Sequence, residues 1–124
     1  MKKLSIGIDL GGTKILTAVV NKENGEIISS VKKKTKKDKG SDKIVQKIIN
    51  SVYEVLEQSN IDIAEIDNIG IGVAGQTDRE KGIIINAPNI EFSNIEIKDI
   101  LKKEFNKPIY LGNDVEIATI GEMY

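Results

Sequence analysis

The fold is decided by Ile6-Gly7-Ile8-Asp9-Leu10-Gly11-Gly12-Thr13-Lys14. Apolar residues alternate with small or polar ones up to Asp9, which is the period-2 pattern of a strand with one apolar face. Apolar residues resume from Ile15 to Val20 and predict a second strand. The two glycines between these strands can adopt a positive φ, and they let a ligand approach backbone N–H groups that favour an anion. A tight, ligand-accessible turn is therefore predicted.

This turn also carries an acid, a hydroxyl and a base. Thr13 adds a hydroxyl donor and Lys14 adds a positive charge. A carboxylate would repel a phosphate directly, so Asp9 beside a phosphate-shaped turn indicates an intervening hydrated cation such as Mg²⁺. The alternative is a plain hairpin with a glycine turn and a solvated lysine. We favour the phosphate site, because a two-residue hairpin needs none of these three side chains.

Composition excludes several classes of protein. The chain has 124 residues, which is the length of one domain, and its net charge of -1 gives no field that would gather nucleic acid or an anionic membrane. Its apolar runs are too short to span a bilayer or to form a signal peptide. It has no cysteine and no histidine, which excludes disulfides, Cys/His zinc sites and Ser-His-Asp catalysis. We therefore expect a cytoplasmic protein that moves protons with carboxylates, Lys or Tyr.

The order of elements predicts a mixed sheet. Asn24-Gly25 predicts a type I′ hairpin leading into a third strand, from Glu26 to about Lys32. The basic run Lys32–Lys39 lacks interleaved aromatic residues, so it indicates a solvated strand end rather than a nucleic-acid patch. An amphipathic helix follows, ending at about Gln58, and then a buried strand over Ile66–Val73. Hairpins followed by a helix and a strand imply a crossover to a parallel neighbour.

Gly70–Gly75 matches the G-x-G-x-x-G pattern of dinucleotide-binding proteins, but its context is wrong. That fingerprint requires a helix to begin inside the motif. Here a polar turn, Gln76–Gly82, is followed by a strand at Ile83–Ile85. Gly72 and Gly75 are better explained as a strand end that backbone or ligand approaches closely.

The last third of the chain adds polar loops and two helices. The proline of Asn86-Ala87-Pro88-Asn89 would aim the side chain of Asn89, whose amide suits either a vicinal diol or an Asx-turn. Ser93-Asn94-Ile95-Glu96 resembles a capping box that starts a second helix. A short strand at Ile109–Leu111 precedes a third helix, predicted from Val115 to at least Glu122.

Asp114 has two interpretations that the pattern leaves open. Asp before a helix is an ordinary N-cap that accepts hydrogen bonds from the first N–H groups of the helix. A carboxylate at the carboxyl end of a strand is also where ligands bind in open α/β sheets, and there it would serve as a general base.

Taken together, these residues resemble the ROK family (repressor, open reading frame, kinase), and within it the bacterial sugar kinases. The resemblance covers nearly all 124 residues. The motifs that carry it are Gly7–Lys14, Gly70–Gly75, Asn86–Asn89, Asn113-Asp114 and Gly121-Glu122. It implies an α/β fold over residues 1–124: the amino-terminal actin-like ATPase, or ribonuclease-H-like, lobe. That lobe has a five-stranded mixed sheet with three helices on both faces.

The resemblance implies a site for ATP and Mg²⁺ at the first turn. Gly11, Gly12, Thr13 and Lys14 would receive the ATP phosphates. Asp9 would act on the Mg²⁺ through water. ATP and a small-molecule sugar are thus the implied ligands, with no nucleic acid and no membrane as partners.

The resemblance also implies a sugar site and a catalytic residue. Asn89 and Asn113 would hold sugar hydroxyls, and Gly75 would lend its backbone to the pocket wall. Asp114 would contact the sugar and take the proton from the attacking hydroxyl, on C6 of a hexose. The activity implied is glucokinase-like phosphorylation.

The family's carboxyl-terminal lobe has no counterpart in this sequence. That lobe carries the adenosine pocket, further sugar ligands and a Cys/His zinc motif, so zinc is expected only there. The chain ends at Tyr124 inside a predicted helix, which indicates a piece of a longer kinase. We expect the isolated chain to be inactive and the full-length protein to be a homo-oligomer, as a dimer. Gly112 and Glu116 depart from the Glu and Asn that the family commonly has there.

Two other functions stay open. One is a sugar-sensing, non-catalytic or transcriptional-regulator member of the same family, for which a general base such as Asp114 has little use. The other is an ATPase regulator of actin-like fold. The amides of Asn89 and Asn113 argue for a polyol substrate instead.

Overall fold

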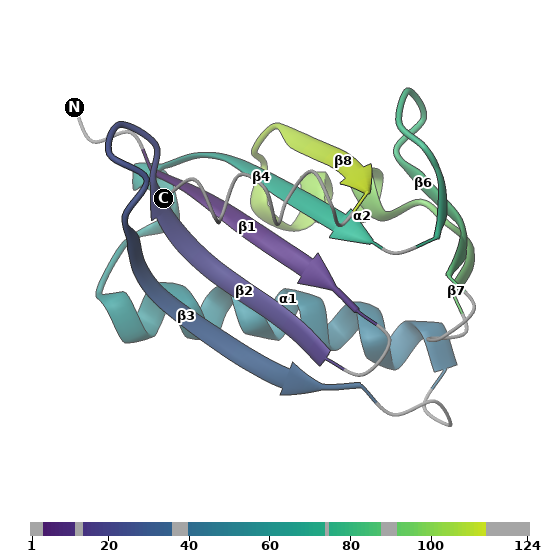
Figure 1. Cartoon of the computed structure of the whole chain (residues 1–124), viewed down its shortest axis with the longest axis horizontal. Coiled ribbons are helices and arrows are strands. Elements are labelled where there is room, and N and C mark those ends of the chain that lie inside the picture. Colours follow the sequence, from purple (N-terminus) through teal and green to yellow (C-terminus); the bar gives the residue numbers. More distant parts are fainter. Residues whose placement is uncertain (1–3, 12–13, 36–39, 74, 88–91, 114–124) are drawn as a thin grey trace.

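A five-stranded mixed sheet forms the centre of the computed structural model, which describes residues 4–11, 14–35, 40–73, 75–87 and 92–113 (Figure 1). Its strands are β1 (Leu4–Leu10), β2 (Lys14–Asn21), β3 (Ile27–Lys34), β4 (Ile66–Val73) and β8 (Ile109–Asn113), in the order β3-β2-β1-β4-β8. β1, β4 and β8 are parallel to one another, and β2 is antiparallel to both β1 and β3. The five-stranded mixed sheet that the sequence predicted is thereby confirmed.

The chain segment between β4 and the helix that precedes β8 forms a second, smaller sheet. It consists of β5 (Gln76–Asp78), β6 (Ile83–Ala87) and β7 (Phe92–Ile95), all antiparallel. Ile84 of β6 is fully buried in the same hydrophobic core as the large sheet. The small sheet is therefore anchored by its apolar side and presents its polar turn outward.

Two α-helices and one 3₁₀ turn complete the described residues. They are α1 (Gly40–Ser59), α2 (Ile97–Phe105) and η2 (Ile63–Glu65). α1 packs its buried stripe on the sheet, and the buried hydroxyls of Thr17 on β2 and Ser51 on α1 are 2.7 Å apart. α2 lies beside α1, with the rings of Tyr53 and Phe105 5.1 Å apart between centroids. No helix in these ranges is long and apolar enough to cross a membrane.

Glu104 on α2 accepts a hydrogen bond from the hydroxyl of Tyr53 on α1. This bond raises the pKa of Tyr53 above its usual value, because ionising the phenol would break it and place two negative charges together. The hydrogen bond therefore joins α1 and α2 at neutral pH and is lost when Tyr53 ionises in alkaline solution.

The predicted three helices on both faces need correction. In the part of the chain that the structure describes, both α-helices pack against one face and share a single hydrophobic core. The helix predicted over Val115–Glu122 lies outside the described residues. The two described helices share one face because the side chains of β1 alternate. Leu4, Ile6, Ile8 and Leu10 are buried beneath the helices. Ser5, Gly7 and Asp9 are on the opposite side of the sheet. We call that opposite side the polar face of the sheet.

The turn between β2 and β3 differs from the predicted type I′ hairpin. A type I′ turn needs positive φ at both central residues, and here Gly25 has φ +73° while Asn24 is not among the residues with positive φ. The loop spans four residues and is closed by the N–H of Asn21, which donates to Glu26 O at 2.8 Å. The side chains of Asn21 and Asn24 accept hydrogen bonds from N–H groups two residues ahead, so they stabilise the loop as Asx-turns.

The predicted capping box at Ser93–Glu96 is also wrong. Residues 92–95 form β7, and Glu96 is the N-cap of α2 without a side-chain capping bond. Pairing with β6 fixes this segment as a strand, and sheet pairing overrides a local capping pattern. The capping box that forms instead belongs to η2, where Asp62 and Glu65 exchange side-chain and backbone hydrogen bonds.

Gly82 ties the small sheet to α2. Its N–H donates to Asp78 O at 2.8 Å, and its carbonyl accepts from the N–H of Lys98 at 3.1 Å. The residue has φ +70°, and an added Cβ would lie 2.2 Å from the Cβ of Lys98. The contact leaves no space for any side chain at this position.

We therefore expect Gly82→Ala to destabilise the protein by roughly 2–5 kcal/mol. The left-handed backbone accounts for about 1–2 kcal/mol, and the forced displacement of α2 for about 1–3 kcal/mol more. Urea unfolding of the purified protein would measure the loss. Gly40→Ala is the matched control, because Gly40 has φ +78° and open space around its Cβ position. Equal losses for the two variants would mean that the contact with Lys98 is unimportant.

Candidate functional site

The carboxyl ends of three parallel strands and the tip of a hairpin meet at one edge of the large sheet (Figure 1). Two rows of residues cross the strands there. Leu10, Val73 and Asn113 are register partners at the ends of β1, β4 and β8. One position earlier, the row consists of Lys32, Leu16, Asp9, Gly72 and Gly112. This edge is where ligands bind in open α/β sheets.

Asp9 lies on the polar face, one residue before the end of the central strand β1. Its side chain is half-buried, and its Oδ1 atom is out of reach of solvent. Its neighbours in the row on β4 and β8 are Gly72 and Gly112, which have no side chain to cover the carboxylate. β4 and β8 therefore place no side chain beside Asp9 in this row.

The turn after β1 is a tight hairpin. The N–H of Gly11 donates to Lys14 O at 2.9 Å, which joins the end of β1 to the start of β2. The N–H of Gly11 is therefore engaged inside the hairpin, and the predicted role of Gly11 at the ATP phosphates stays a prediction. An added Cβ at Gly11 would meet Lys14 O at 3.4 Å, an ordinary contact. The fold therefore does not require glycine there for lack of space.

Gly75 marks the abrupt departure of the chain from β4 into the small sheet. It has φ +154°, a value that residues with a side chain rarely adopt. The strand after it, β5, leads away toward the polar turn at Asp78. The predicted place of Gly75 in a pocket wall is compatible with this position at the strand end.

Several predicted site residues lie outside the described residues or are described only in part. Gly12, Thr13, Asn89 and Asp114 are outside, and for Asn113 only the backbone, as the last residue of β8, is described. Their roles stay predictions. The described residues Asp9, Gly11, Lys14 and Gly75 do gather at the same edge as the end of β8.

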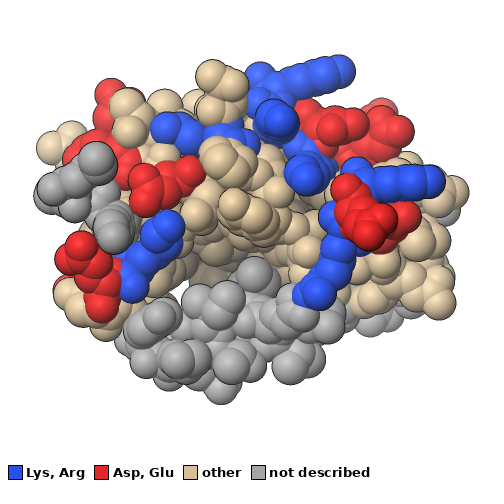
Figure 2. All heavy atoms as spheres, turned by 90° about the horizontal axis from the view of Figure 1, so that it is seen from above, with Lys and Arg blue, Asp and Glu red and all other residues tan. Residues whose placement is uncertain are grey.

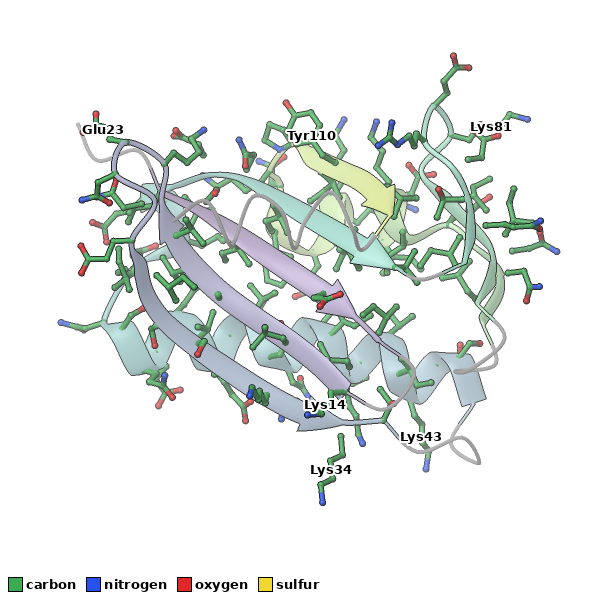
Figure 3. All side chains as sticks on the ribbon, viewed as in Figure 1. Lys14, Glu23, Lys34, Lys43, Lys81 and Tyr110 are labelled. Carbon is green, nitrogen blue, oxygen red and sulfur yellow. The ribbon has the colours of Figure 1, made fainter. Side chains whose placement is uncertain are left out.

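Lys34 is not among the site residues that the sequence predicts. The sequence assigned it to a solvated strand end, and it is indeed the exposed last residue of β3, where it lies directly opposite Lys14. Both side chains are exposed at the site edge (Figure 3). The signal that would have found it, the strand register, is not visible in the sequence.

On the face that Figure 2 shows, the charge is mixed rather than concentrated in one sign. Figure 2 shows basic and acidic side chains interspersed over the face seen from above. The ion pairs Lys22–Asp67 at 3.4 Å and Lys33–Glu54 at 2.9 Å are both on the surface. Such exposed pairs contribute about 0–1 kcal/mol each. The surface in this view therefore offers no broad field for a polyanion.

Comparison with known proteins identifies the family. A model of the ROK family matches residues 5–124. The chain belongs to the ROK family. Among its ROK relatives, a glucokinase of Thermotoga maritima is 34% identical over 126 aligned residues, which include 100% of this chain and 38% of that protein. A xylose repressor of Caldicellulosiruptor bescii is 27% identical over 96% of this chain and 30% of its own length.

Solved structures of ROK proteins confirm the fold. The crystal structure of a ROK family glucokinase from Streptomyces griseus, in complex with glucose and AMPPNP, matches with a TM-score of 0.77 at 33% identity. The match covers 90% of this chain and 33% of the other. The actin-like ATPase fold that the sequence predicted is thus the fold of this chain. The chain spans well under half the length of the ROK relatives it matches.

Proposed function

We propose that the full-length protein is a sugar kinase that transfers a phosphoryl group from ATP to the C6 hydroxyl of a hexose or hexose derivative. One observation carries this proposal: Asp9, the β1–β2 hairpin and the end of β8 meet at one edge of the sheet. Similarity to glucokinases over the whole chain supports it. Phosphoryl transfer depends mainly on positioning and on stabilising charge, and a rigid sheet edge supplies the positioning.

In this proposal the β1–β2 hairpin binds the phosphoryl donor, and the residues near the ends of β4 and β8 bind the sugar. The hairpin residues Gly11, Gly12, Thr13 and Lys14 bind the donor phosphates. Asn89 and Asn113 bind sugar hydroxyls, beside the backbone of Gly75. Asp114 accepts the proton from the attacking hydroxyl.

The residues present fit a magnesium ion held together with the donor. Asp9 offers a carboxylate oxygen, the kind of hard ligand that Mg²⁺ takes. The described ranges contain no group of three or more His, Cys, Asp or Glu that could hold a metal alone. Mg²⁺ is commonly bound by one or two carboxylates, waters and substrate phosphates, and it neutralises charge on the phosphates when bound. Asp9 would hold it through water.

The decisive test is an assay of the full-length protein. Glucose, mannose and N-acetylhexosamines would be offered with Mg·ATP, and the product would be located by phosphorus and carbon NMR. We expect a 6-phosphate, with a turnover number on the order of 10 s⁻¹ for the preferred sugar. Absence of transfer to all of these sugars would overturn the proposal.

A sugar-sensing role is the second candidate, because repressors are among the relatives. Calorimetry of hexose binding, compared with the phosphoryl-transfer assay, separates the two functions. A protein that binds a hexose but transfers no phosphoryl group would be a sensor. A protein that does neither would contradict both.

A substitution at Gly11 tests whether this residue is needed for donor binding or for stability. The backbone there is not in the left-handed region, and a Cβ would touch nothing closer than 3.4 Å. We therefore expect Gly11→Ala to change the melting temperature by less than about 2 °C. If donor phosphates approach the hairpin closely, the KM for Mg·ATP should rise about tenfold while the KM for the sugar stays the same. Unchanged constants for both substrates would mean that the ligand does not approach this residue.

A further inference from the structure

The pairing of β2 with β3 brings two lysines together at the site edge. Lys14 is the first residue of β2, Lys34 is the last residue of β3, and the two are direct register partners. Directly opposite residues in an antiparallel pair project from the same face, with Cβ atoms about 4.5–5.5 Å apart. Lys32, two residues earlier on β3, is exposed on that same face.

This face is also the one that carries Asp9. Lys32 and Asp9 belong to one row across the sheet, through Leu16. Two residues nearer the edge, Lys34 is in line with Lys14, whose carbonyl accepts a hydrogen bond from the N–H of Gly11. Lys34 therefore adds a positive charge beside the β1–β2 hairpin, on the edge strand β3.

Ion pairs with carboxylates are found for two other lysines of the described ranges, but not for this pair. Lys22 and Lys33 each form an ion pair, with Asp67 and Glu54 respectively. Over the described ranges, no ion pair is found for Lys14 or Lys34. Like charges directly opposite each other on a sheet are destabilising, by about 0.2–1 kcal/mol. An anion between the two ammonium groups would reverse that repulsion.

A third cation supports the same edge from α1. Nζ of Lys47 donates a hydrogen bond to the carbonyl of Lys34 at 2.7 Å. This contact holds the end of β3 and adds a positive charge behind the strand. Figure 3 shows Lys14 and Lys34 at the hairpin end of the sheet, and the labelled Lys43 of α1 at the same end of the molecule.

We propose that Lys34 and Lys14 together bind the phosphate chain of the phosphoryl donor, as a cationic pair contributed by two strands. The proposal rests on the proposed kinase function and adds to it a binding residue on β3. The ligand chemistry is a linear chain of linked phosphates, as in a nucleoside triphosphate or an inorganic polyphosphate. Lysine suits this role because its ammonium is a point charge on a flexible stem that can follow such a chain.

The test is Lys34→Gln in the full-length protein. The substitution keeps the carbonyl that Lys47 binds, so the end of β3 should hold its place. We expect the KM for Mg·ATP to rise about 5- to 10-fold, the KM for the sugar to stay within twofold, and the melting temperature to stay equal or rise. The effect should shrink as salt is added, because exposed charges are screened. A cost to stability with no change in donor KM would overturn the proposal.

Lys43→Gln is the matched control, because it removes the same charge at the same end of the molecule from an exposed position on α1. It should leave the KM for Mg·ATP unchanged. An equal rise for both variants would show a general field effect and would overturn the specific pair.

Direct binding of inorganic tripolyphosphate separates this proposal from the kinase assignment. Calorimetry should show weaker tripolyphosphate binding to Lys34→Gln than to the wild type, whether or not any sugar is phosphorylated. Equal losses with tripolyphosphate and ATP indicate recognition of the phosphate chain, and larger losses with long polyphosphate indicate that donor as the better fit. If the wild type and the variant bind tripolyphosphate alike, or neither binds it, the pair is not a phosphate site.

Discussion

Asp114→Asn in the full-length protein is expected to lower kcat by about 10²–10⁴-fold, the usual contribution of a positioned general base. Asparagine caps a helix about as well as aspartate, so the start of the predicted helix should be unaffected. It cannot accept the proton of the attacking hydroxyl. The melting temperature and the sugar affinity should therefore stay close to those of the wild type, as thermal unfolding and calorimetry would show.

Asp114→Ala serves as the companion variant. It should show the same catalytic defect and an added loss of about 1 kcal/mol of stability, because alanine cannot cap. Asp99→Asn, at an exposed site in the first turn of α2, is the control and should leave kcat unchanged. If Asp114→Asn retains most of its kcat, Asp114 is only a cap and the proposed mechanism loses its base.

Residues 1–124 alone are expected to phosphorylate no hexose above background, which corresponds to a loss on the order of 10⁵-fold or more relative to the full-length protein. Such factors come from holding both reactants between fixed groups. This chain provides one sheet edge and spans 38% of the length of the glucokinase relative from Thermotoga maritima. A coupled assay with Mg·ATP and a panel of hexoses would measure the rate.

Circular dichroism is the necessary control, because an unfolded fragment would also be inactive. A folded fragment without activity agrees with a site completed by further residues. Turnover comparable to that of the full-length protein would show that the edge described here is sufficient, and would contradict the expectation that the isolated chain is inactive.

Much of the core was predictable from periodicity. The strand predicted over Ile66–Val73 is β4 with the same bounds, and the amphipathic helix ends at Ser59, one residue beyond its predicted end. Apolar spacing suffices for such elements because burial of one face is the dominant stabilising term, whatever the partners are. The alternation through β1 likewise assigned Asp9 to the face opposite the core, and the structure agrees.

Short local signals predicted less well. Asn24-Gly25 and Ser93–Glu96 each match a motif, yet the first forms a four-residue loop and the second a strand. A few residues are compatible with several backbones, and contacts with distant segments select among them. The site was predictable only as a list of residues, because its assembly depends on which strands are neighbours.

The hairpin, the buried strands and the long helix follow from local patterns of glycine and apolar residues, which favour the same structure in any compact arrangement. Local patterns do not determine which lysine of β3 lies beside Lys14 at the site. The β2–β3 register shifts by one residue between Val19 and Val20, and this irregularity pairs Lys14 with Lys34. Without the shift, Lys33 would be opposite Lys14. Because side chains alternate between the faces of a strand, Lys34 would then project from the opposite face. The shift also turns Lys33 to the helix side, where it meets Glu54 of α1. The register is a property of the pairing of β2 with β3, and the local pattern of either strand does not specify it.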